Sequence, residues 1–301
     1  MQLGFVGTGV MGAPMIGHLA NAGHDLTVFD VDHDAIARVR AAVPSVRVAG
    51  SPRELAAASE IVFTMLPNGR EVQRCVAGDH GLGAGMRAGS LLIDTSSSEP
   101  PLTRETSATL ARLGVSMLDA PVSGAVEGAE AAELVFMVGG AETDLARARP
   151  LLQLLGNTII HLGPVGAGHL MKTVNNLATA LTLAGTLEAM SIGRAGGLDP
   201  ARMLEVLNVS TGGSFVSRNK IGQHILPGTF EDPFKLALMF KDVCIAREEA
   251  HGFGLELPVT ELGHQIWAQA ASALEPQASV MALARWYAAQ TGVRLWEERD
   301  A

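Results

Sequence analysis

A lysine and an amide lie four residues apart at the start of a helical pattern, directly after a glycine-rich turn. The segment from Lys172 to Asn176 follows the run 163–168, which contains three glycines. Side chains at positions i and i+4 stack on adjacent helical turns, so both can reach one small ligand. Such a lysine can act as a general acid or base if its pKa falls from about 10.4 toward neutrality. A lysine near a helix start is more often a solvated surface charge, and the catalytic interpretation depends on the rest of the chain.

The N-terminus carries a glycine-rich loop between a buried strand, residues 2–6, and a helical pattern. Gly7 suits the tight turn, Gly9 lets the backbone approach a pyrophosphate, and Gly12 lets the helix pack closely on the strand. The helix N-terminus then faces the phosphates. We therefore expect a dinucleotide to bind here, with contacts from Gly7, Gly9, Val10, Met11 and Gly12.

An acidic residue, Asp30, ends the second predicted strand, roughly 20 residues beyond the glycine loop. A carboxylate at this place accepts the ribose hydroxyls of NAD and repels the extra phosphate of NADP. The alternative is that Asp30 caps the next helix, although Asp32 or Asp34 could do this equally well. We expect NAD as the cofactor, in preference to NADP.

Strand and helix patterns alternate as far as His161, which predicts an α/β Rossmann domain with a doubly wound, mostly parallel sheet. After Gly163 the strand patterns stop, and helical patterns predict an all-α second domain joined by a long helix. We place the NAD-binding domain at 1–163 and the substrate and oligomerisation domain at 164–301. The predicted strands are 2–6, 25–30, 61–66, 91–94, 115–118 and 134–138, and the later predicted helices are 167–195, 200–209, 234–252, 258–271 and 279–290.

Composition fits an enzyme that acts on a small molecule. The chain has 301 residues, 48% of them hydrophobic, which suffices for two domains with sizeable cores. The net charge of −9 argues against a nucleic acid partner, because phosphate binding needs a basic face. The nine histidines lack metal-ligand spacing, so we expect no metal site and interpret His161 and His169 as structural or surface residues.

The location is expected to be cytoplasmic. Two cysteines, far apart and outside any CxxC pair, fit a reducing compartment. The chain enters a strand directly after Met1, so we expect no signal peptide. The longest apolar stretch, residues 177–193, contains three threonines and a glutamate and lacks charged membrane flanks. We interpret it as a buried helix, which excludes a membrane span and predicts a homodimer or homotetramer.

Short motifs follow several strands at the edge where open α/β sheets bind ligands. They are 65–68, 94–97 and 119–125. Together with 168–176 and 240–242 they make the chain resemble the β-hydroxyacid dehydrogenases. That family includes 3-hydroxyisobutyrate dehydrogenase, tartronate semialdehyde reductase and, more distantly, 6-phosphogluconate dehydrogenase. The resemblance extends from Gly4 to about Trp286 and implies hydride transfer between NAD and a small β-hydroxyacid.

The resemblance also implies roles for individual residues. Lys172 matches the catalytic lysine, and Lys241 matches a lysine that reaches the cofactor from the helical domain. Ser123 and Gly124 match the clamp for the substrate carboxylate. The remaining matches are Asn175, Asn176 and Asp242 on the substrate side, and Leu66, Pro67 and Thr95 along the cofactor.

Two departures from the family pattern and several alternatives remain. Ala125 stands where many relatives have a second glycine, which bears on the acid that fits, and Ala132 with Glu133 replaces the usual Gly-Thr. The region that selects the acid is expected around 211–215, but the pattern does not name the acid. Imine reductases share the architecture and commonly lack the lysine, whereas an NAD-binding sensor would be expected to lose the proton-transfer residue. A partner-binding scaffold would leave these motifs unexplained.

Overall fold

The computed structural model describes residues 1–297 and divides into two compact units. Unit 1 is Met1–Lys172, and unit 2 is Thr173–Ala301, of which 298–301 lie outside the described residues. The division falls nine residues after the boundary predicted at 163. The predicted domain limits remain a prediction, and the end of the predicted second domain lies outside the described residues.

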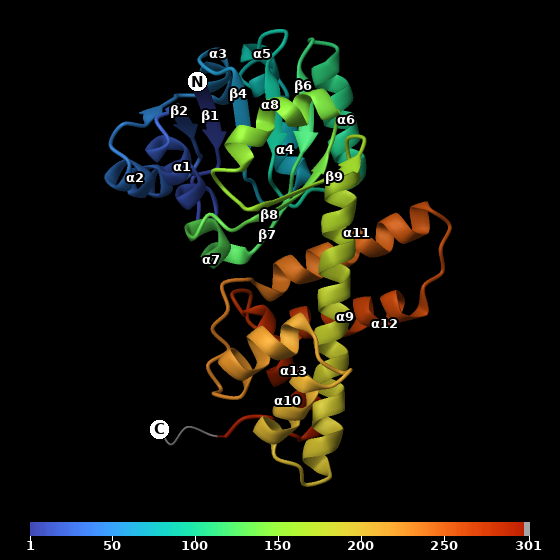
Figure 1. The fold of residues 1–301 in the computed structure, drawn as a ribbon. Helices are drawn as coiled ribbons and strands as arrows, with labels where there is room; N and C mark the ends of the chain where they lie inside the picture. The colour runs from blue at the N-terminus through green and yellow to red at the C-terminus, as the bar shows by residue number, and fades with distance from the viewer. Residues whose placement is uncertain (298–301) are drawn as a thin grey trace. The chain divides into compact units, whose positions relative to one another are not determined.

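Unit 1 is a nine-stranded, mostly parallel sheet with helices on both faces (Figure 1). The strand order is β3-β2-β1-β4-β5-β6-β8-β7, and β9 pairs with β8. β8 pairs antiparallel with β6 and β7 and parallel with β9, so β8 and β9 run opposite to the other strands. The predicted Rossmann architecture is confirmed. The strands are β1 Gln2–Val6, β2 Asp25–Phe29, β3 Arg47–Val48, β4 Ile61–Thr64, β5 Leu91–Asp94, β6 Ser116–Asp119, β7 Val122–Ser123, β8 Val135–Gly139 and β9 Thr158–Gly163.

Both faces of the sheet are buried, which explains why its central strands are mainly apolar before their polar carboxyl ends. Phe5 and Phe63 stack on one face with ring centroids 5.7 Å apart. Their neighbours Val6 and Val62 belong to the core on the other face, because successive side chains of a strand point to opposite sides. The covering helices are α1 Gly12–Asn21, α2 His33–Ala42, α3 Pro52–Ala57, α4 Gly69–Val76, α5 Leu82–Gly85, α6 Pro100–Ala111, α7 Ala125–Glu130 and α8 Glu142–Leu152.

Unit 2 is built from helices around one core, in which Trp267 is fully buried. Its longest helix, α9 (Ala167–Ala195), begins in unit 1 and runs without interruption for 29 residues. Apart from one isolated bridge between Lys235 and Ser279, no strand occurs between residues 173 and 297. The all-α prediction is confirmed. The other helices are α10 Pro200–Val209, the π-helix η1 Ser217–Ile225, α11 Leu236–Gly252, α12 Pro258–Ala273, the 3-10 helix η2 Val280–Ala282 and α13 Leu283–Thr291.

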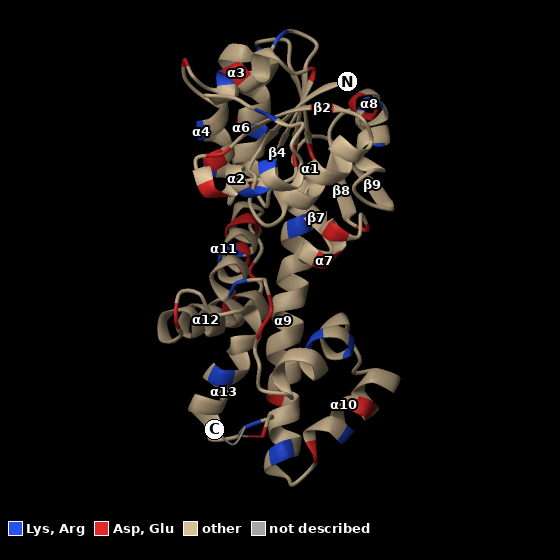
Figure 2. Ribbon diagram, turned by 90° about the vertical axis from the view of Figure 1, so that its left-hand side faces the viewer, with Lys and Arg blue, Asp and Glu red and all other residues tan. Residues whose placement is uncertain are grey.

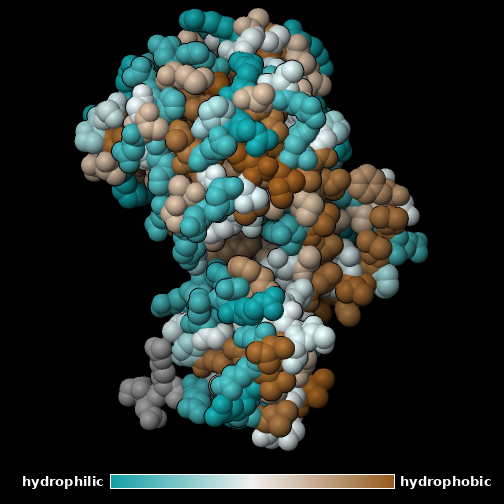
Figure 3. Space-filling view, viewed as in Figure 1, coloured by the Kyte–Doolittle hydropathy of each residue, from teal (hydrophilic) through white to brown (hydrophobic). Residues whose placement is uncertain are grey.

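Apolar side chains are exposed where α11 turns into α12. Phe253, Val259 and Leu262 are each about 60% exposed, and Leu255 and Leu257 beside them are also exposed. Figure 3 shows this end of unit 2 as hydrophobic surface. Within residues 1–297, no helix has both the length and the apolar character that crossing a membrane requires.

Candidate active site

The glycine loop after β1 has the geometry of a phosphate cradle. Gly7 has φ +98°, and a Cβ there would lie 2.2 Å from the carbonyl oxygen of Met65. A Cβ on Gly12 would lie 1.9 Å from the carbonyl oxygen of Gly7, so the start of α1 can approach β1 only with glycine here. Gly9 differs, because a Cβ there would have no atom within 4 Å. The open space at Gly9, beside the N-terminus of α1, fits the pyrophosphate of a dinucleotide.

Asp30 follows β2 and turns back toward this loop. Its Oδ2 accepts hydrogen bonds from the backbone N–H of Thr8 at 2.6 Å and from the Thr8 hydroxyl at 3.1 Å. Its Oδ1 accepts from the N–H of Asp32. The cap of α2 is Asp32, which accepts from the N–H groups of Asp34 and Ala35. The capping alternative for Asp30 is therefore wrong, and Asp30 instead joins the end of β2 to the glycine loop.

The loops after β4 and β5 are tied together at the same edge of the sheet. The N–H of Leu66 donates to Oγ of Ser96 at 2.9 Å, and Pro67 beside it is exposed. Thr95 is 1% exposed, and its hydroxyl donates to the carbonyl oxygen of Thr64 at 2.7 Å. The Thr95 hydroxyl thus bonds to the backbone in this structure, whereas Leu66 is partly buried against the core and Pro67 is exposed.

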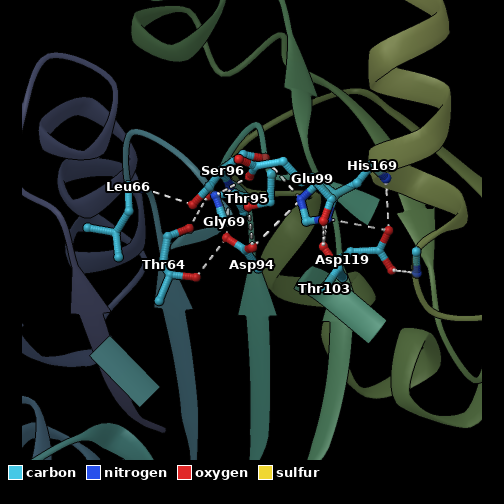
Figure 4. Close-up of polar contacts among 12 residues, drawn as sticks. Thr64, Leu66, Gly69, Asp94, Thr95, Ser96, Glu99, Thr103, Asp119 and His169 are labelled. Carbon is cyan, nitrogen blue, oxygen red and sulfur yellow. Dashed lines mark hydrogen bonds and ion pairs between the residues drawn. The ribbon is translucent and has the colours of Figure 1, made fainter. Parts of the chain in front are cut away.

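A buried polar network that the sequence patterns did not predict lies behind these loops (Figure 4). Asp94, Asp119 and His169 are all fully buried. Asp94 accepts hydrogen bonds from the Thr64 and Ser98 hydroxyls. The two nitrogens of the His169 ring lie 3.7 Å and 3.8 Å from the carboxylates of Asp94 and Asp119 respectively. His169 was predicted to be a structural or surface residue, and the structure shows that it is buried. The acidic residues at the ends of β5 and β6 were the sequence feature that could have indicated this network.

Asp119 holds the start of α9 against the sheet. Its Oδ1 accepts from the N–H of Gly166 at 2.7 Å, and its Oδ2 accepts from the N–H of His169 at 2.8 Å. Gly168 packs so closely that a Cβ there would lie 2.2 Å from the carbonyl oxygen of Met137. Lys172 is half-buried one turn further along the same helix. The strand ends therefore fix the helical turn that carries this lysine.

The segment after β7 has an unusual backbone. Ser123 ends β7 half-buried, and Gly124 follows with φ +129° as the first cap residue of α7. Ala125 and Ala132 both have positive φ, +54° and +56°. These are the two positions where the family pattern has glycine, and side chains other than glycine are strained in this conformation by roughly 1–2 kcal/mol. The departures thus place strain on both sides of α7.

Replacing Ala132 by glycine should stabilise the protein. The strain relieved exceeds the entropy that glycine adds to the unfolded chain, about 0.4–1 kcal/mol, and leaves a net gain of about 0.5–1 kcal/mol. Ala131→Gly is the matched control. Because Ala131 has φ −81°, this substitution relieves no strain and adds only the entropic cost of glycine. The urea midpoint of unfolding should be highest for Ala132→Gly, intermediate for wild type and lowest for Ala131→Gly. A higher midpoint for Ala131→Gly than for Ala132→Gly would contradict the assignment of strain.

The site residues predicted in unit 2 form one hydrogen-bonded chain. Nδ2 of Asn175 donates to Oδ1 of Asn176 at 3.1 Å, and Nδ2 of Asn176 donates to Oδ2 of Asp242 at 2.5 Å. Nζ of Lys241 lies 3.2 Å from Oδ1 of Asp242. Asn176 and Asp242 are both buried. The amide of Asn176 is thus oriented by an acid on α11.

Neither the distribution of charge nor the grouping of metal-ligand side chains adds a further candidate site among the described residues. Among residues 1–297, no group of three or more His, Cys, Asp or Glu side chains could hold a metal ion. Figure 2 shows acidic and basic segments interspersed along each unit, while α9 is uncharged over most of its length. The site therefore depends on the glycine loop, the strand ends and the start of α9.

Two family descriptions match consecutive parts of the chain. "NAD binding domain of 6-phosphogluconate dehydrogenase" matches residues 2–163, and "NAD-binding of NADP-dependent 3-hydroxyisobutyrate dehydrogenase" matches residues 166–287. The 2-(hydroxymethyl)glutarate dehydrogenase of Eubacterium barkeri is 35% identical over 267 residues, which cover 89% of this chain and 88% of the relative. The chain belongs to the β-hydroxyacid dehydrogenase family. The family predicted from the motifs is confirmed, as is an oxidoreductase with an NAD(P)-binding domain.

Solved structures agree with this placement. The 3-hydroxyisobutyrate dehydrogenase of Mycobacterium tuberculosis, described with L-serine, is 34% identical with a TM-score of 0.85, covering 94% of this chain and 97% of its own. An imine reductase from Myxococcus stipitatus in complex with NADP+ is 19% identical with a TM-score of 0.64, covering 95% of this chain and all of its own. The second likeness concerns the fold alone.

Proposed function

We propose that this protein transfers a hydride between NAD and a small β-hydroxyacid, with Lys172 as the general acid and base. The observation that carries the proposal is the position of Lys172. It stands half-buried on the first turns of α9, at the carboxyl edge of the sheet where Asp119 and His169 hold the helix. Ligands of open α/β sheets bind at this edge.

The use of lysine in the chain supports a special role for this residue. Only four of the 22 lysines and arginines are lysines, and Lys172 is the only lysine among the first 219 residues. The chain thus supplies the surface cations of unit 1 as arginine, which weakens the interpretation of Lys172 as a solvated charge. A lysine can release its proton near neutral pH after a pKa shift, and an arginine cannot. The rare lysine, unlike the abundant arginines, is therefore suited to proton transfer.

The roles of the residues follow from the chemistry of the alcohol. NAD, when bound, accepts the hydride from the carbon that bears the hydroxyl. Nζ of neutral Lys172 takes the hydroxyl proton in the oxidation and returns it in the reduction. The Ser123 hydroxyl and the backbone N–H groups near Gly124 hold the substrate carboxylate, which orients the β-carbon. The further roles we propose are cofactor binding by Gly7, Gly9, Val10, Met11, Gly12, Asp30, Leu66, Pro67, Thr95 and Lys241, and substrate binding by Asn175, Asn176 and Asp242.

The substrate class follows from what the relatives' names have in common. 2-(Hydroxymethyl)glutarate, 3-hydroxyisobutyrate and L-serine each carry a hydroxymethyl group on the carbon next to a carboxylate. We therefore propose an acid of this type. The test is NADH production with these three acids, with lactate as a control that has its hydroxyl one carbon nearer the carboxylate. Turnover of lactate alone would contradict the proposal.

The same assay separates the alternatives. An imine reductase would oxidise NADPH with a cyclic imine and leave the hydroxyacids unchanged. A non-catalytic sensor would bind NAD in a titration and produce no NADH with any acid. Activity with at least one β-hydroxyacid, without imine reduction, is the result that we expect.

NAD should be preferred over NADP by at least about tenfold in kcat/KM, or roughly 1.4 kcal/mol. Asp30 places a carboxylate after β2, and residues 30–34 contain two further aspartates and no lysine or arginine. Exposed Val31 offers the extra phosphate no positive charge. The measurement is kcat/KM with each cofactor. Asp30→Asn keeps an acceptor for the N–H of Thr8 and should reduce the preference; equal kcat/KM values in the wild type would contradict it.

We also propose a homodimer or homotetramer formed through α9. Its exposed positions Val174, Ala178, Gly185 and Ile192 recur at spacings of four and seven residues and lie on one face of the helix. Light scattering at micromolar concentration should show an oligomer, and Ile192→Glu should dissociate it. Val209→Glu is the control, because Val209 is equally exposed but lies on α10. A monomeric wild type would refute the proposal.

We keep the cytoplasmic location as a proposal. Cys75 and Cys244 are both free thiols. Burial, with a smaller contribution from Asp94, raises the pKa of the Cys75 thiol to about 12, so this cysteine stays protonated and unreactive. Two unpaired thiols are compatible with a reducing compartment.

A further inference from the structure

We propose that His169 is a positioning residue, which sets the place of Lys172 by joining the start of α9 to the loop after β5. This inference rests on the proposed function, because it assumes that Lys172 transfers the proton. His169 itself is fully buried, so its ring presents no surface to a bound ligand in this structure. It acts through the helix that it anchors.

The ring of His169 bonds to two different elements of unit 1. Its Nε2 lies 3.1 Å from the carbonyl oxygen of Ser96, after β5. A carbonyl oxygen only accepts, so Nε2 carries a hydrogen. Its Nδ1 lies 2.7 Å from Oγ1 of Thr103, on α6. Together with the bond from its own N–H to Asp119, the residue connects α9 to β6, α6 and the Ser96 loop (Figure 4).

Ser96 links the same histidine to the proposed cofactor edge. While its carbonyl oxygen faces His169, its hydroxyl accepts the N–H of Leu66 at 2.9 Å. The bond between Leu66 and the Ser96 hydroxyl does not involve the His169 ring, so loss of the ring should affect the helix that carries Lys172 more than the loop that carries Leu66. A polar chain of three residues thus spans from the loop after β4 to the start of α9.

Stability alone gives a poor account of this arrangement. Two buried carboxylates, Asp94 and Asp119, flank a buried imidazole within 4 Å. Apolar replacements for buried charged groups are often neutral or stabilising, whereas a satisfied polar network fixes one geometry. The network is satisfied, since each carboxylate accepts at least two hydrogen bonds. Its effect is to define the position of the first turn of α9.

A shift of that turn would move Lys172 as well, because both lie on α9. Residues three apart lie on nearly the same side of a helix, one turn apart. Gly168 leaves no room between α9 and the strand ends, because a Cβ there would lie 2.7 Å from the carbonyl oxygen of Asp119. The ring bonds of His169 to Ser96 and Thr103 therefore add to the restraint that Asp119 and the close packing at Gly168 place on the helix. Misplacement of a reacting group by about 1 Å costs on the order of 100-fold in rate.

The experiment compares three variants in single-turnover hydride transfer, with NAD affinity measured beside it. His169→Leu removes both ring bonds and should slow the step about 10–100-fold, with NAD affinity and substrate KM within about threefold of wild type. His169→Gln keeps a donor for Ser96 and should recover most of the rate. His161→Leu is the control, because His161 lies on β9 and its Nε2 is also 2.8 Å from a backbone carbonyl oxygen, that of Gly140. The rate of this variant should equal that of wild type.

A double variant separates this inference from the proposed function. If His169 acts through Lys172, adding His169→Leu to Lys172→Met should cause no further loss beyond about threefold, because residues that act as a unit are not additive. Equal losses in both backgrounds would overturn the inference and leave the proposed function standing. A fully active Lys172→Met variant would instead overturn the proposed function.

Two further outcomes also decide the matter. A His169→Gln rate as low as that of His169→Leu would overturn the inference, because the Ser96 bond would then be irrelevant. If His169→Leu does not fold, Thr103→Val replaces it, since this substitution removes only the hydroxyl beside Nδ1. A kcat lowered at least threefold with unchanged NAD affinity supports the inference, and an unchanged kcat overturns it.

Discussion

Lys172→Met should slow hydride transfer by about 10²–10⁴-fold, the range that general acid–base catalysis contributes. Methionine keeps most of the length and apolar bulk of lysine, so packing around the half-buried position should be preserved. NAD affinity should hardly change, because it depends on the glycine loop after β1. Single-turnover hydride transfer beside a cofactor titration measures both quantities.

The control for this substitution is Lys235→Met, which makes the same chemical change at a lysine whose Nζ donates to the carbonyl oxygen of Gln277. It should react at the wild-type rate. If Lys172→Met reacts within a few-fold of wild type, Lys172 is a positioning or surface residue and the proposed mechanism is wrong. A parallel collapse of NAD affinity would show that the substitution had disturbed the fold, and the slower reaction would then be no evidence for acid–base catalysis by Lys172.

Ser123→Ala should raise KM for the acid about 10- to 150-fold and leave NAD affinity within twofold. The expected change corresponds to one charge-assisted hydrogen bond, worth about 1.5–3 kcal/mol. Ser123 ends β7 half-buried, next to Gly124, whose φ of +129° permits the turn into α7. The measurement is steady-state kinetics with the acid varied at saturating NAD.

Ser59→Ala is the matched control for the loss of a hydroxyl. Ser59 is buried before β4, at the amino end of the sheet, where its hydroxyl donates to the carbonyl oxygen of Leu55 at 2.7 Å. Its KM for the acid should be that of wild type. An unchanged KM in Ser123→Ala would reduce Ser123 and Gly124 to a structural turn and remove the proposed carboxylate clamp.

The fold was largely predictable because its main elements carry strong patterns. The strands β1, β4 and β5 consist mainly of apolar residues, since helices cover both faces, and α9 was predicted with its observed limits. Three strands were missed. β3 and β7 have only two residues each, and β9 alternates between half-buried and exposed positions in a chain segment that pairs only with β8. No helix was predicted over 217–225, where the structure has a π-helix.

The site was predictable where one residue type has few uses. At positions 7 and 12 a Cβ would lie near 2 Å from a backbone oxygen, so glycine is required. Such positions can be recognised in the sequence. His169 was not predictable, because a single histidine on an apolar helix has the same local sequence whether it is a core residue or an anchor. Its partners Asp94 and Asp119 lie 75 and 50 residues earlier in the chain, and only the folded sheet brings them to it.

The two hydrogen bonds that Asp119 accepts at the start of α9 also bear on how this part of the chain folds. Starting a helix is its least favourable step, and two N–H groups at this start are satisfied by a carboxylate 47 and 50 residues earlier. The first turn of α9 therefore gains these two hydrogen bonds only when β6 is in place in the sheet. In the native protein, the amide hydrogens of Gly166 and His169 should exchange with solvent at the rate set by opening of the sheet, since local protection follows the most stable structure that holds each group.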